Sequence, residues 1–352
     1  MAARRRPAAR ARRAARPHRW ERLDDAALLR RPLRALGLQV RRCAALQRCV
    51  DQLHAELAAR GIRFRPHVWL AEEWFSPDGV PGIAIPFYLA HARLRALERR
   101  ITHEVEGSNE RWLMRLLRHE AGHAIDNAYR LRRRARWRAV FGPASQPYRA
   151  WYRARPASRH HVQHLGDWYA QSHPTEDFAE TFATWLQPRS DWRRRYAGWP
   201  ALRKLRFVEE IAAEIGALPA PVRTRTRIEP LAESTRTLEE HYRHKLAWLA
   251  RRRRALADSI LRRAFPVREP AGKLAAATLL RAHKQALVRS LMRTTGFNRY
   301  SVHQIMRMAI ERCERLELAV RPPRRQALRR ARAALAHLVH AYGRSEALRV
   351  TA

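Results

Sequence analysis

The sequence is poor in glycine, lysine and cysteine. Its 13 glycines among 352 residues allow few tight turns, whereas alanine, leucine and arginine are abundant and favour helices. The composition therefore predicts a predominantly helical chain. Three cysteines, Cys43, Cys49 and Cys313, do not make a disulfide framework, because their number is odd and small. A reducing, cytoplasmic compartment is the expectation.

Long hydrophobic runs are also missing. No stretch approaches the length of a membrane span, and the basic residues 1–6 are not followed by the apolar run of a secretion signal. Hydrophobic residues still make up 46% of the chain and include 11 tryptophans, so a sizeable core is expected. The length predicts one large domain with an appendage.

Acidic residues are scarce as well. There are 72 lysines and arginines against 32 acidic residues, which gives a net charge of +40, and such a charge attracts polyanions. Only four of the basic residues are lysines. This skew toward arginine, together with much alanine and proline, is typical of a GC-rich bacterial genome. The charge therefore identifies no specific partner, and non-specific binding of nucleic acid through the basic regions stays open.

Residues 118–126 read Arg-His-Glu-Ala-Gly-His-Ala-Ile-Asp. On a helix, His119 and His123 project from one face and can share a metal ion, and Glu120 can reach a water bound to that ion. The candidate caps Ser108 and Asn109 and the helical spacing of apolar residues predict a helix that runs to about Arg132. A catalytic zinc ion needs three protein ligands, and the two imidazoles provide only two of them.

A second motif occupies residues 169–182. Pro174 suits the first turn of a helix, and Glu176 and Glu180 are four residues apart on one face of it. Another face of this helix is apolar and is expected to lie in the core; its residues are Phe178, Phe182 and Trp185. One carboxylate can complete a metal site, and the other can orient a histidine through its second ring nitrogen.

Together, HEAGHAID and Y-x-x-S-x-P-x-EDFAETF resemble the gluzincin-type peptidases related to anthrax lethal factor. They are more similar still to the bacterial family called putative zinc-binding metallopeptidases. The resemblance covers roughly residues 60–215. It implies an α+β zincin fold that is mostly helical, one Zn²⁺ per chain, and peptide or protein substrates.

The resemblance also implies a role for each motif residue. His119, His123 and Glu176 correspond to the metal ligands, and Glu120 corresponds to the general base. The remaining matches are Glu180 as a carboxylate behind a ligand and Tyr169 as the tyrosine that stabilises the transition state.

Three further residues lie near these motifs. His164 and Asp167 are rivals of Glu176 for the third ligand position, Asp167 because some zincins use an aspartate just before their tyrosine. Asp126 follows His123 by one helical turn. It is expected to support the site or to pack against the backbone rather than to bind metal.

The expected organisation has four segments. Residues 1–20 form a disordered basic tail, 21–218 a zincin-like metallopeptidase domain, 219–230 a proline-rich linker and 231–352 a basic helical extension. Strands are expected near 62–70 and 82–89, before the metal helix. A substrate peptide could pair with the second strand, although an ordinary edge strand would give the same pattern.

The sequence thus favours a zinc-dependent peptidase. The alternative is a catalytically inactive zincin-like protein whose basic C-terminal region binds nucleic acid or an acidic partner. The extension itself reads either as a helical cap packed on the peptidase or as an electrostatic patch. The basic tail has a comparable alternative, an arm that contacts nucleic acid or anionic lipid.

Overall fold

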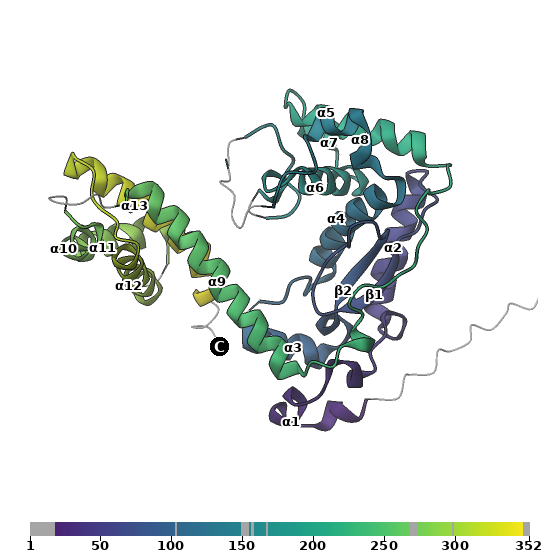
Figure 1. Cartoon of the computed structure of the whole chain (residues 1–352), viewed down its shortest axis with the longest axis horizontal. Helices are drawn as coiled ribbons and strands as arrows, with labels where there is room; N and C mark the ends of the chain where they lie inside the picture. Colours follow the sequence, from purple (N-terminus) through teal and green to yellow (C-terminus); the bar gives the residue numbers. More distant parts are fainter. Residues whose placement is uncertain are drawn as a thin grey trace, which may run out of the picture.

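The computed structural model describes residues 18–102, 104–148, 155, 158–166, 168–267, 274–297 and 299–347. This part of the chain is predominantly helical with a small sheet (Figure 1), so the expectation of a mostly helical α+β protein is confirmed. The strands are β1 (His67–Ala71) and β2 (Gly82–Pro86). The helices are α1 (Asp25–Leu29), α2 (Ala44–Ala59), α3 (Ala92–Thr102), α4 (Glu110–Tyr129), α5 (Ala135–Phe141), α6 (Pro174–Leu186), α7 (Trp192–Arg195), α8 (Ala201–Ile215), α9 (Leu238–Ala264), α10 (Ala276–Ala282), α11 (Lys284–Thr295), α12 (Arg299–Arg315) and α13 (Arg324–Ala347).

The two strands pair in parallel, with His67 opposite Gly82 and Ala71 opposite Pro86. Both lie close to the positions expected from the sequence, and all five residues of β2 are buried. On the other edge of β2, the Ala84 N–H donates to the Phe75 carbonyl at 2.9 Å. A substrate strand added at Ala84 would therefore have to displace Phe75 first.

The larger hydrophobic cluster surrounds α4, the helix that carries both histidines of the first motif. Helix α2 packs along one side of α4, where Arg118 donates two hydrogen bonds of 2.7 Å to the buried carboxylate of Glu56. Helix α6 packs on another side, and α8 covers α6 through apolar residues that include Leu205 and Val208. The helix that follows Pro200 thus covers the second motif helix.

The N-terminal end of the described chain is folded onto this cluster. Trp20, which the expected tail included, is only 2% exposed, and its indole N–H donates to the Leu36 carbonyl at 2.9 Å. Residues 1–17 of that tail lie outside the described residues.

A second hydrophobic cluster is formed by the end of α9 and by α10 to α13. Helix α9 contributes to both clusters, because Leu238 and Tyr242 belong to the first and Ala257 belongs to the second. Figure 1 shows α9 running from beside α3 to the second group of helices. The division between the clusters thus falls inside α9, whereas the sequence places a linker at 219–230. That segment is bonded to the first cluster, for example through Val222 N–H and the Ala128 carbonyl at 3.0 Å.

The beginning of α9 is fixed by ion pairs. The Lys245 ammonium lies 2.9 Å from carboxylate oxygens of both Glu73 and Glu98. Burial alone lowers the pKa of Lys245, but the two carboxylates outweigh burial and raise it. Lys245 therefore stays charged, and its ion pairs hold α9 against the loop that follows β1.

The sequence predicts neither a membrane span nor a disulfide framework. Within the described residues, every helix is too short or too polar to traverse a lipid bilayer. The side chains of Cys43, Cys49 and Cys313 are free thiols.

Candidate metal centre

Helix α4 begins as the sequence predicts. The side chain of Asn109 caps it by accepting a hydrogen bond of 2.9 Å from the Trp112 N–H, which satisfies one of the free donors of the first turn. The helix ends at Tyr129, about one turn before the expected end, because Arg130 adopts the left-handed conformation with φ 52°. All residues of the motif except His123 are buried, and His123 is half-buried.

Helix α6 starts at Pro174 after the cap His173, whose ring nitrogen Nδ1 accepts from the Thr175 N–H at 3.2 Å. It crosses α4 at Gly122. A Cβ atom at Gly122 would lie only 2.8 Å from the Ala179 Cα atom, so only glycine permits this close approach. The approach places the carboxylate face of α6 directly against the histidine face of α4.

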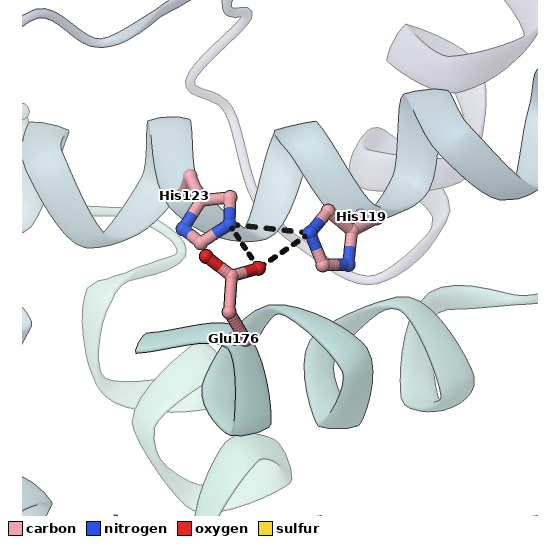
Figure 2. Close-up of side chains that lie close together, drawn as sticks. All are labelled: His119, His123 and Glu176. Carbon is pink, nitrogen blue, oxygen red and sulfur yellow. Dashed lines mark hydrogen bonds and ion pairs between the residues drawn. The ribbon is translucent and has the colours of Figure 1, made fainter. Parts of the chain in front are cut away.

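Three candidate ligands meet at this crossing. The Glu176 Oε2 atom lies 3.0 Å from His119 Nε2 and 3.2 Å from His123 Nε2, and the two nitrogens are 3.2 Å apart. Figure 2 shows the carboxylate rising from α6 toward the two imidazoles of α4. All three side chains can contribute an atom to one metal ion.

The chemistry of these atoms fits a cation. His119 Nδ1 lies 3.0 Å from Glu180 Oε1; because a carboxylate can only accept, Nδ1 carries the proton and Nε2 of the neutral ring has a lone pair. A neutral His123 protonated at Nδ1 would add a second imidazole lone pair, so that two imidazoles and a carboxylate would face one another. Ligand bonds of roughly 2.0–2.1 Å to tetrahedral zinc place ligand atoms about 3.3–3.4 Å apart, close to the separations observed here.

The electrostatics agree with this fit. Burial favours the neutral form of His119, but hydrogen bonds and charge from Glu176 and Glu180 raise its pKa well above the usual value. Burial raises the pKa of Glu176, yet the two histidines outweigh burial and hold that pKa well below its usual value. The centre therefore strongly favours positive charge among its three inward-facing atoms.

Glu180 links the centre to the loop before α6. It is fully buried. While Oε1 binds the His119 ring, Oε2 accepts the Leu165 N–H at 2.8 Å and the His164 N–H at 3.3 Å. These bonds fix both the ring of His119 and its tautomer.

Glu120 is the next residue along α4. It is 8% exposed, and its Oε2 atom has no hydrogen-bond partner among the described residues. A buried carboxylate oxygen without a partner costs free energy. Such an atom beside a metal centre is typical of a group that binds water or substrate.

Residues 89–192 match the family model of the "Putative zinc-binding metallo-peptidase" family. The match extends from the end of the 3-10 turn before α3 to the start of α7, and it contains both motifs. No curated protein and no solved structure matches the chain. The similarity thus supports a metallopeptidase-type hydrolase with a peptide or protein substrate.

The structure also places the other residues that the sequence singled out. The ring of Tyr169 lies beside that of His119, with 5.7 Å between ring centroids. Asp126 is fully buried, and its carboxylate accepts hydrogen bonds of 2.8 Å from the Arg132 N–H and 2.6 Å from Arg132 Nε. Of the two expectations for Asp126, packing against the backbone is the one that these contacts favour.

Of the two rival ligands, His164 is not part of the cluster. His164 Nε2 lies 3.0 Å from the Arg115 carbonyl, so this ring nitrogen is directed away from the other imidazoles. Burial lowers the pKa of His164 to about 4, which keeps the ring neutral. Asp167 lies outside the described residues.

One residue at the centre was not anticipated from the sequence. The hydroxyl of Tyr148 lies 2.8 Å from Glu176 Oε1. Tyr148 lies in the stretch of chain between the two motifs. No motif or spacing marks it, because its contact with Glu176 joins residues that are 28 positions apart.

Proposed function

We propose that this chain is a zinc-dependent peptidase of the gluzincin type, with His119, His123 and Glu176 as ligands. The convergence of these three side chains carries the proposal, together with the unpartnered oxygen of Glu120, the residue that follows His119. A zinc ion bound there would act as a Lewis acid that lowers the pKa of water and polarises a carbonyl group. The three free thiols fit a reducing compartment such as the cytoplasm.

Three residues of the chain would carry out proton transfer, stabilise the oxyanion and orient a ligand. Glu120 accepts a proton from the attacking water at Oε2 and delivers it to the leaving amine. The Tyr169 hydroxyl donates a hydrogen bond to the oxyanion that develops on the scissile carbonyl. Glu180 retains the Nδ1 proton on His119, so that Nε2 presents its lone pair to the ion.

Removal of zinc tests this function. Treatment with 1,10-phenanthroline is expected to abolish hydrolysis of a mixed peptide library, because the proposed chemistry depends on the ion. One equivalent of zinc, but not of magnesium, should restore cleavage after the chelator is removed, since two imidazoles favour zinc. Cleavage that persists in protein freed of zinc would contradict the proposal.

A further inference from the structure

The two oxygens of the Glu176 carboxylate have different partners. Oε2 faces His119 and His123, whereas Oε1 accepts a hydrogen bond of 2.8 Å from the Tyr148 hydroxyl. Because the carboxylate can only accept, the hydroxyl proton of Tyr148 points toward it. Tyr148 thus occupies the oxygen that does not face the imidazoles.

Tyr148 is itself held in place by residues at the start of α6. Its ring stacks on the His173 imidazole, with 3.9 Å between centroids and an angle of 15° between the planes. Its hydroxyl also lies 2.6 Å from the Thr175 Oγ1 atom. His173 is fixed in turn, because its Nε2 lies 2.8 Å from the Gln146 carbonyl.

Tyr148 combines a largely exposed side chain with a hydroxyl that reaches a buried carboxylate. Tyr148 is 62% exposed, which makes it the most exposed of the large hydrophobic side chains in the described chain, and its hydroxyl still reaches the 5%-exposed Glu176. Exposure of an aromatic ring gains little hydrophobic stabilisation. Burial in the core therefore does not explain its position, whereas the stacking on His173 and the hydrogen bond to a candidate ligand do.

We infer that Tyr148 is a positioning residue for Glu176. Its hydroxyl binds Oε1, so that Oε2, which faces the imidazoles, would be the oxygen that holds an ion. This inference rests on the proposed function, since it requires a metal ion among the three ligands. Groups that hydrogen-bond to metal ligands typically change metal affinity by roughly 10- to 100-fold when they are removed.

The test compares two phenylalanine variants. Tyr148→Phe keeps the ring that stacks on His173 and removes only the hydroxyl. Tyr129→Phe is the matched control, because it too removes one tyrosine hydroxyl. Tyr129 is the last residue of α4, and its hydroxyl donates to the Leu218 carbonyl at 3.0 Å rather than to a candidate ligand. Zinc affinity is measured by competition with a chromophoric chelator. The visible spectrum of the cobalt-substituted proteins is recorded as well.

Tyr148→Phe is expected to bind zinc roughly 10- to 100-fold more weakly than the parent chain, with Tyr129→Phe unchanged. The cobalt absorption of Tyr148→Phe should weaken, because a freed Oε1 raises the coordination number. Equal zinc affinity and equal cobalt spectra in the parent and Tyr148→Phe would overturn the positioning role and leave the proposed function intact. A parent chain that binds no zinc would overturn both.

Discussion

Replacement of Glu120 by glutamine is expected to lower kcat by roughly 100- to 10,000-fold, the usual contribution of a general base. Glutamine keeps the size of the side chain but cannot accept the proton of the attacking water. The zinc content should stay at the parent value, because Glu120 is not among the three clustered ligand atoms. Steady-state kinetics on a cleaved peptide and metal analysis of the same preparation measure the two effects.

The control for Glu120→Gln is the thermal unfolding of the variant. Since Oε2 has no hydrogen-bond partner among the described residues, its exchange for an amide removes no such contact, and the melting temperature should not fall. Full activity in a folded, zinc-loaded variant would remove Glu120 from the mechanism and leave the metal centre in place.

Replacement of Gly122 by alanine is expected to reduce both stability and zinc content. The new Cβ would lie 2.8 Å from the Ala179 Cα atom, and a backbone atom cannot rotate away. Alanine favours a helix over glycine by about 1 kcal/mol, but overpacking at a helix crossing costs about 1–3 kcal/mol. Separation of α4 from α6 would also move Glu176 away from both histidines. Thermal unfolding and metal analysis measure these two effects.

Gly166→Ala provides the matched control for this substitution. A Cβ atom there meets no atom within 4 Å, so the melting temperature and the zinc content should match those of the parent. If Gly122→Ala also behaved like the parent, the close crossing would not be needed to assemble the centre.

Much of the candidate site follows from local sequence. The four-residue spacings of His119 with His123 and of Glu176 with Glu180 place each pair on one helix face, and the structure has both helices. The cap Asn109 and the first-turn residue Pro174 also occur where the sequence puts them. Such features depend only on neighbouring residues, and local chemistry determines them.

The rest depends on contacts between distant segments. Tyr148 reaches Glu176 across 28 positions of the chain, and Arg118 reaches Glu56 across 62. No period or spacing encodes such pairs. The same reason explains segment 219–230: proline and arginine suggest a free linker, but composition does not reveal that its backbone bonds to the end of α4.

The most direct measurement is the zinc content of the intact chain and of Glu176→Ala, determined in parallel by mass spectrometry after preparation without chelators and reconstitution with zinc. The account predicts about one zinc ion per chain in the parent, and loss of most of it in Glu176→Ala. Zinc retained in that variant would move the third ligand to another residue, such as Asp167. No zinc in the intact chain would contradict the account and turn attention to the basic C-terminal region as the functional part of the protein.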